Sequence, residues 1–230
     1  MTREPDKTRE PQYQRTLELD NSIGRTTLGL LSNQAWHDDP RHVLFVMSRY
    51  KFVSKMLSGK DRVLEVGCGD AFFTRLVQQE VGSLCAVDFD PVFGSDINAR
   101  MEKNWEFEHR THDILEGPVD GSFDAAYALD VIEHIPQELE REFVENIFDS
   151  LSTNGVLIVG TPTIQSQTYA SEGSKAGHVN CKDQKELREL MQDYFHNVFV
   201  FSMNDEVVHT GYYPMAHYMF AVCVGKKIGN

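Results

Sequence analysis

The chain has 230 residues, 41% of them hydrophobic, which suits one α/β domain with a full core and leaves little room for a second. Its formal net charge of −13 argues against a basic face that grips nucleic acid. Its four cysteines form no C-x-x-C pair, and no apolar run has the length of a leader or membrane span. We therefore expect a cytoplasmic protein with reduced thiols and no membrane or nucleic-acid partner.

The N-terminal 1–20 is polar and charged and contains two prolines, so we expect a mobile arm there and a single domain over 21–230. A helix is predicted over 38–57, with Asp39 as its N-cap and Pro40 in its first position. Strands and helices then alternate, a pattern typical of a parallel sheet. The expected strands are 62–66, 84–89, a stretch near 105–110, 123–129 and 155–160, and the expected helices are 71–80 and 136–151.

The last third of the chain departs from this alternation. Residues 161–182 form a long polar stretch without clear periodicity, and such loops in compact domains usually serve a function. A capping box formed by Asp183 and Glu186 then opens a helix, and two strands, 196–201 and 217–224, can pair antiparallel. The expected fold is α/β, with one doubly wound, mostly parallel sheet of seven strands, an antiparallel terminal strand and helices on both faces.

The stretch "VLEVGCGDAF" places Gly67 and Gly69 just after the first strand, where bare backbone lets a ligand approach the turn. A dinucleotide-binding pattern needs a third glycine at position 72, which is Phe72 here. A Walker loop is also absent, because no G-K-[ST] follows. The sequence therefore argues against NAD and nucleoside triphosphates as ligands.

The same stretch resembles the first motif of class I S-adenosylmethionine-dependent methyltransferases, E/D-x-G-x-G-x-G, with Ala71 in place of the last glycine. The later motifs follow in order as "AVDFDP", "HDIL" and "FDAAYALDVIEHIP". The resemblance implies that S-adenosylmethionine is the cofactor, with Asp88 on the ribose hydroxyls, Phe89 against adenine and Asp113 on the adenine amine. The full set of cofactor-binding residues that it implies is Glu65, Gly67, Cys68, Gly69, Asp88, Phe89, Asp113, Ile114 and Leu129.

Methyl transfer to a hydroxyl calls for a base or a metal ion beside the acceptor. Asp130, Glu133 and His134 would share one face of a helical turn, a spacing similar to the metal ligands of ubiquinone-biosynthesis and small-RNA methyltransferases. Three ligands make an incomplete set, so we expect no metal. A histidine then supplies the base, and His178, His134 and His209 are the candidates.

The polar segment 161–182 is the expected acceptor-site loop. Its composition favours methyl transfer to the hydroxyl oxygen of a sugar or another small hydroxylated metabolite. A protein methyltransferase and a non-catalytic cofactor-binding module stay open as alternatives. The sequence leaves the oligomeric state open.

Overall fold

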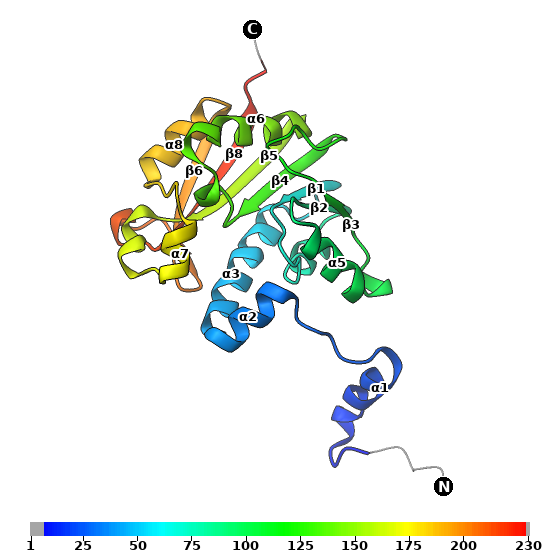
Figure 1. Ribbon diagram of the computed structural model, residues 1–230. Helices are drawn as coiled ribbons and strands as arrows, with labels where there is room; N and C mark the ends of the chain where they lie inside the picture. The colour runs from blue at the N-terminus through cyan, green and yellow to red at the C-terminus, as the bar shows by residue number, and fades with distance from the viewer. Residues whose placement is uncertain (1–6, 229–230) are drawn as a thin grey trace.

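The computed structural model describes residues 7–228, which form one mixed sheet of eight strands in the order β3-β2-β1-β4-β5-β8-β6-β7, flanked by helices (Figure 1). Five strands run parallel, and the C-terminal strands pair antiparallel, as expected. The sheet has one strand more than predicted, because a hairpin at Asp205 adds the short edge strand β7. The strands are β1 (Arg62–Val66), β2 (Ser83–Asp88), β3 (Glu108–Thr111), β4 (Phe123–Leu129), β5 (Leu151–Pro162), β6 (Phe195–Asn204), β7 (Val207–His209) and β8 (Tyr218–Lys226).

Two hydrophobic clusters cover the two faces of the central strands. Alternate side chains of β1 enter opposite clusters, Leu64 with α6 and Val63 with α3, as the period of a strand requires. Because β1 and β4 are buried on both faces, they are nearly continuous apolar runs. The helices are α1 (Gln14–Ile23), α2 (Leu30–Asp38), α3 (Pro40–Met56), α4 (Arg75–Gln78), α5 (Pro91–Arg100), α6 (Glu140–Ser150), α7 (Glu172–Gly177) and α8 (Gln184–Gln192).

The helix predicted over 71–80 is confined to α4. Three residues after β1 have positive φ, namely Gly67 (+73°), Gly69 (+52°) and Ala71 (+50°). This left-handed backbone is incompatible with a helix, so the chain turns until Arg75. The delayed start leaves the backbone after β1 free to form the wall of a cavity.

The polar segment 161–182 is more regular than its composition suggested. It contains the 3₁₀ helix η5 (Ile164–Tyr169) and α7. Thr163 caps η5 by accepting from Ser166 N, and Ser171 caps α7 by accepting from Ser174 N. Turns of six residues are too short to reveal a helical period in the sequence.

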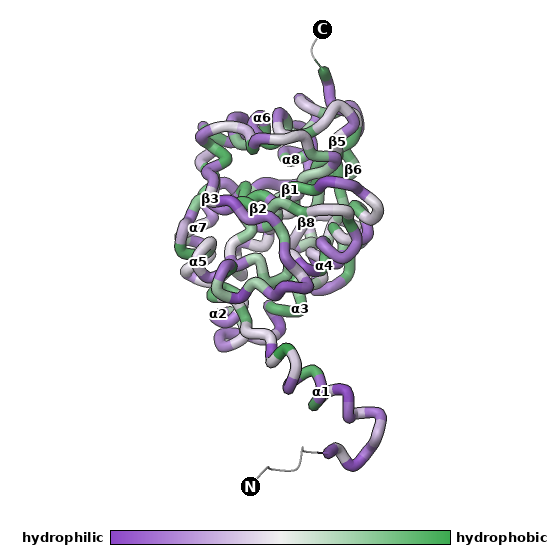
Figure 2. The backbone as a smooth tube through the Cα atoms, turned by 90° about the vertical axis from the view of Figure 1, so that its right-hand side faces the viewer, coloured by the Kyte–Doolittle hydropathy of each residue, from purple (hydrophilic) through white to green (hydrophobic). Residues whose placement is uncertain are grey.

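The expected N-terminal arm is partly helical. Residues 1–6 lie outside the described part of the chain, but α1 follows them and projects away from the domain in both overall views (Figures 1 and 2). No side chain of α1 is buried. Within residues 7–228, no helix has both the length and the apolar character that a membrane crossing demands.

Candidate active site

A cavity of about 610 Å³ opens at the carboxyl ends of β1, β2 and β4, the edge where open α/β sheets bind ligands. Six of the predicted cofactor-binding residues line it, namely Gly67, Gly69, Asp88, Phe89, Asp113 and Ile114, and so does His134, one of the predicted bases. The lining also includes residues that the sequence did not single out, among them Leu31, Phe93, His112 and Val131, and it includes Asp130, which the sequence grouped with Glu133 and His134.

The two glycines are required by close approach as well as by their positive φ. A Cβ atom added to Gly67 would collide with the Val131 side chain. A Cβ added to Gly69 would lie 2.7 Å from Leu31 Cδ1. Neighbouring side chains therefore pack directly on this loop, and its backbone forms part of the cavity wall.

Asp88 ends β2 with both carboxylate oxygens oriented by backbone donors. Its Oδ2 accepts from Gly69 N at 2.8 Å, and its Oδ1 accepts from Asp90 N at 3.0 Å. The residue is 7% exposed. Each oxygen keeps a further lone pair, so the carboxylate can accept from hydroxyl groups of a ligand in the cavity. Phe89 beside it is 70% exposed, and its ring lines the same cavity.

Asp113 and Ile114 lie just after β3, the strand that pairs with β2, and line the same cavity as Asp88. Asp113 Oδ1 accepts from Leu115 N at 2.9 Å, which fixes the turn that presents both residues to the cavity. Ile114 is buried against the core. The wall thus offers one carboxylate next to an apolar surface, a pair that suits the edge and the face of an aromatic base.

Glu65, predicted from the motif, is not among the residues that line the cavity. It is 1% exposed and accepts hydrogen bonds from Tyr50 Oη and Thr74 Oγ1, both at 2.6 Å. Burial raises the pKa of Glu65 to about 7. The carboxyl group joins α3 to the segment that follows the glycine loop, so its part in ligand binding is indirect.

Cys68 and Leu129, also predicted from the motifs, are likewise absent from the cavity lining. Both are buried and belong to the hydrophobic cluster that contains α3. Burial raises the pKa of the Cys68 thiol, so it stays protonated. Their positions in the motif are those of core residues that support the loop.

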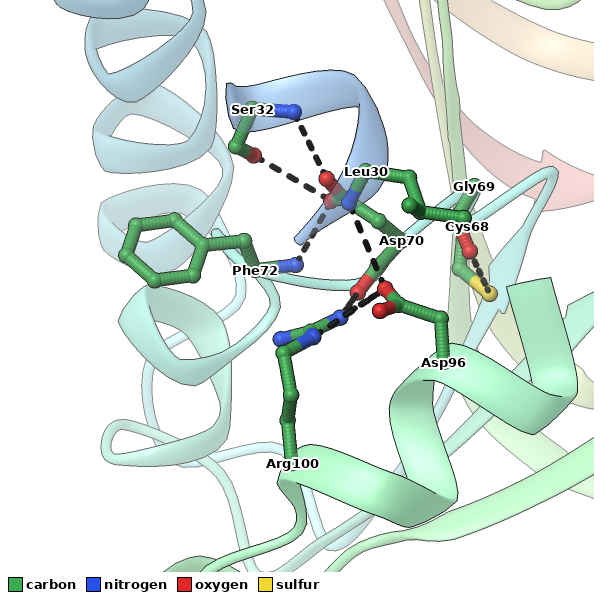
Figure 3. A network of polar contacts seen from close by, with 8 residues as sticks. All are labelled: Leu30, Ser32, Cys68, Gly69, Asp70, Phe72, Asp96 and Arg100. Atoms are coloured by element: carbon green, nitrogen blue, oxygen red, sulfur yellow. Dashed lines mark hydrogen bonds and ion pairs between the residues drawn. The ribbon is translucent and has the colours of Figure 1, made fainter. Parts of the chain in front are cut away.

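Asp70 connects the glycine loop to the N-terminal segment (Figure 3). Its carboxylate accepts from Ser32 N at 2.7 Å, from Ser32 Oγ at 3.2 Å and from Phe72 N at 3.0 Å. Arg100 donates to the Asp70 carbonyl oxygen and pairs with Asp96, which accepts from Leu30 N at 3.3 Å. These contacts hold the start of α2 against the loop and place Leu31 at the cavity.

A cluster of acid and imidazole groups adjoins the cavity through His134. Glu133, His134 and His178 each offer a ligand atom, and these atoms lie within 4.8 Å of one another. His134 Nδ1 is 2.9 Å from Gly177 O, and His178 Nδ1 is 2.9 Å from Gln167 Oε1. Because carbonyl oxygens only accept, each Nδ1 carries a proton, and in a neutral ring Nε2 is then the atom with the free lone pair.

The electrostatics of the cluster favour the neutral forms of His178 and Glu133. Burial and then the neighbouring His134 lower the pKa of His178. Burial and then Asp130 raise the pKa of Glu133 to about 8, while Thr161 Oγ1 donates to it at 2.9 Å. At neutral pH the cluster therefore presents an uncharged imidazole whose Nε2 can take a proton.

Two predicted members of this site lie elsewhere. In β7, His209 Nε2 is 2.8 Å from Asn204 Oδ1 and its Nδ1 accepts from Gly211 N at 3.0 Å, so both ring nitrogens are engaged within the hairpin. Asp130 lines the cavity but forms an ion pair with Arg49 instead of joining Glu133 and His134. His178 takes its place in the cluster, a proximity that only the fold creates.

The sheet order, with the antiparallel strand β8 between β5 and β6, and a glycine-walled cavity at the carboxyl edge define a Rossmann-like methyltransferase fold. A family model described as a methyltransferase domain matches residues 36–195. This chain belongs to that methyltransferase domain family.

One curated relative supports the same classification, and two solved structures share the fold. A probable S-adenosylmethionine-dependent methyltransferase of Mycolicibacterium smegmatis is 29% identical over 139 residues, which are 60% of this chain and 49% of that protein. This chain therefore matches about half the length of that relative. The N-methyltransferase NodS of Bradyrhizobium japonicum, solved with S-adenosyl-L-homocysteine, superposes with a TM-score of 0.64 at 17% identity, covering 90% of this chain and 96% of NodS. The small RNA methyltransferase HEN1 gives a TM-score of 0.64 at 16% identity, covering 81% of this chain and 26% of HEN1.

Proposed function

We propose that this protein transfers the methyl group of S-adenosylmethionine to a hydroxyl oxygen of a small polar acceptor, such as a sugar or another hydroxylated metabolite. The observation that carries the proposal is the contact between the cavity of Asp88 and Asp113 and the histidine cluster at His134. The carboxylates that suit a nucleoside cofactor therefore line a cavity that also borders the proposed base.

The cofactor assignment is supported by the match between cavity and ligand. The paired lone pairs of Asp88 suit a ribose diol, and the exposed ring of Phe89 suits an adenine face. Asp113, after the neighbouring strand β3, can accept from an exocyclic amine. The M. smegmatis relative is named for the same cofactor, which adds a second line of support.

His178 is the proposed general base. As an acceptor oxygen attacks the methyl carbon, the bond from that carbon to sulfur breaks and the hydroxyl proton passes to His178 Nε2. The products are a methyl ether, S-adenosylhomocysteine and an imidazolium. Gln167 holds the opposite ring nitrogen and so keeps the reactive one in its basic form.

The polar acceptor is supported by the segment that supplies this base. Gln167 and the capping hydroxyls of Thr163 and Ser171 belong to it, and Gln165 Oε1 on η5 is buried with no hydrogen-bond partner within residues 7–228. An acceptor hydroxyl would satisfy such an oxygen. NodS is named as an N-methyltransferase and HEN1 acts on small RNA, so nitrogen and RNA acceptors are the competing classes. The net charge of −13 favours a small molecule over RNA.

A second mechanism is favoured by the composition of the cluster. One carboxylate and two imidazoles, each with its Nδ1 proton on a carbonyl, are groups that can hold a divalent transition metal, with Glu133, His134 and His178 as ligands. Such an ion would lower the pKa of the acceptor hydroxyl as a Lewis acid. It would also have to displace the proton that Glu133 retains at neutral pH.

The test is a screen of hydroxylated metabolites for release of S-adenosylhomocysteine, followed by His178→Ala. We expect this variant to lose turnover and to keep its affinity for S-adenosylhomocysteine. His209→Ala is the matched control, because its ring is engaged within the hairpin and should be dispensable. A His178→Ala enzyme with normal turnover would overturn the base assignment. Turnover on RNA or amines alone would overturn the acceptor class.

A further inference from the structure

A ring of three polar side chains ties the end of the polar segment 161–182 to the first turn of α6. Lys182 forms an ion pair with Glu140 and donates from Nζ to Asn180 Oδ1 at 3.0 Å. Asn180 closes the ring, because its Nδ2 donates to Glu140 Oε2 at 3.0 Å. Lys182 and Asn180 are 6% and 7% exposed, and the side chain of Glu140 is 14% exposed. The ring therefore lies inside the domain, where water competes little for its groups.

The chemistry of this ring indicates placement rather than stability as its role. Lysine is seldom buried unless it is paired, and a buried ion pair loses about as much through desolvation as it gains through attraction. Such a pair does favour one arrangement, because a displaced Lys182 would leave the Glu140 carboxylate without its counter-charge. Asn180 adds direction, because its amide presents the oxygen to Lys182 and the nitrogen to Glu140.

Backbone contacts connect the ring to both ends of the segment and to the histidine cluster. Thr163 forms a parallel bridge with Lys182, and the residue after Thr163 donates its backbone N–H to Lys182 O at 2.9 Å. Asn180 N donates to Glu133 O at 3.0 Å, which joins the ring to the cluster itself. The segment between Thr163 and Lys182 therefore leaves and re-enters the domain at one place, beside the cluster.

His178 lies two residues before Asn180, so the closed end of the segment determines where it sits. Its ring meets the His134 ring edge to face, with the centroids 5.1 Å apart. Gln167, on the same segment, holds its Nδ1. The reaction proposed above requires His178 Nε2 at the attacking hydroxyl, and a displacement of about 1 Å can cost a factor of about 100 in rate.

We propose that Lys182 and Glu140 are positioning residues for His178. Their buried pair fixes Asn180 on the Glu133 carbonyl group, and this contact keeps the base at the acceptor. The proposal rests on the proposed function, because it takes His178 as the base. Of the described residues, those that line the cofactor cavity include no member of the ring, so the ring should affect turnover and not cofactor affinity.

Kinetics of a single and a double variant test this proposal. Lys182→Met removes the ammonium group, and we expect kcat to fall about 10- to 100-fold while the affinity for S-adenosylhomocysteine stays within about twofold. The double variant Lys182→Met/Glu140→Met replaces both charges by apolar groups, which should restore stability in a thermal melt and leave kcat low. Lys185→Met is the matched control with wild-type kcat, since Lys185 forms an exposed pair with Glu189.

The pH dependence of kcat separates placement from stability. His178 faces Glu133 and His134, and Asp130 is the further charge that acts on it. Burial in the cluster lowers the pKa of His178. If Lys182→Met releases the base from the cluster, the pH midpoint of kcat should therefore move upward, toward the ordinary histidine value of about 6.5.

Wild-type kcat in either variant would overturn the proposal, and so would a reduced kcat with an unmoved pH midpoint. An equal loss of S-adenosylhomocysteine affinity would show a general disturbance and overturn it too. If the single variant does not fold, the same measurements on the double variant decide. Normal turnover in His178→Ala would overturn the base assignment and this proposal together. An inactive His178→Ala beside a fully active Lys182→Met would overturn the positioning role alone.

Discussion

Replacing Asp88 by alanine tests the assignment of the cavity most directly. The carboxylate is 7% exposed, and both its oxygens are already oriented by Gly69 N and Asp90 N. Because the carboxylate is already held in place, it loses little conformational freedom when a ribose binds, and its hydrogen bonds to the ribose hydroxyls should contribute close to their full strength. Bonds to a charged acceptor are worth about 1.5–3 kcal/mol, which corresponds to a loss of affinity of about 10- to 150-fold in Asp88→Ala.

The assay is titration calorimetry with S-adenosylhomocysteine, supported by a thermal melt to show that the variant is folded. Asp90→Ala is the control, because Asp90 accepts from Val92 N at the start of α5. Its removal should lower stability by about 1 kcal/mol, as for a lost helix cap, and leave affinity unchanged. Unaltered affinity in a folded Asp88→Ala variant, or an equal loss in Asp90→Ala, would refute the reasoning. Comparable binding of NADH by the wild type would refute the ligand class.

Three further outcomes are expected. Burial raises the folded-state pKa of Glu65 to about 7, so the native state retains a proton that the unfolded chain releases, and stability should fall as pH rises from about 4.5 to 7. In denaturant titrations across that range, Glu65→Gln should flatten the slope of stability against pH. An unchanged slope would contradict the burial argument. Deleting 166–175 should abolish turnover while cofactor affinity stays within a fewfold range, and a folded deletion variant with normal rates would exclude a role for this segment at the acceptor. Turnover should survive dialysis against EDTA, and it should rise with pH below the usual histidine pKa of about 6.5, since the pKa of His178 is lowered. If chelation abolishes turnover, one added metal restores it, and Glu133→Ala prevents that recovery, then the metal mechanism replaces the base mechanism.

The sheet could be predicted because its strands are buried on both faces, which leaves short apolar runs such as Arg62–Val66 and Phe123–Leu129. The helix α5 escaped prediction because "PVFGSDINAR" is poor in helix-forming residues. Tertiary packing stabilises it instead, with Gly94 so close to β3 that an added Cβ would lie 2.8 Å from the His109 ring. Local helix propensity depends on neighbouring residues in the sequence, so it does not predict such a contact.

In the candidate site too, residues with a local sequence signal could be predicted, and residues whose role depends on distant contacts could not. Gly67, Gly69 and Asp88 could be found because a strand end and a motif mark them in the sequence. Glu65 belongs to the same motif, yet strand alternation turns it into the core, toward Tyr50. His178 and Lys182 have no local signal, since their significance comes from Glu133 and Glu140, partners that lie 45 and 42 positions away in the chain.

The hydrogen bonds of Asp70 connect the N-terminal segment to the glycine loop, so this segment should influence ligand affinity. Asp70 bonds to Ser32 on one side and continues the backbone of Gly69 on the other, so order in either element favours order in its neighbour. Such coupling is reciprocal: a ligand that steadies the loop must steady α2 by the same free energy. Amide hydrogens at the start of α2 should therefore exchange more slowly when the cavity is filled. Changes upstream of Leu30 can tune affinity without altering any group that touches the ligand.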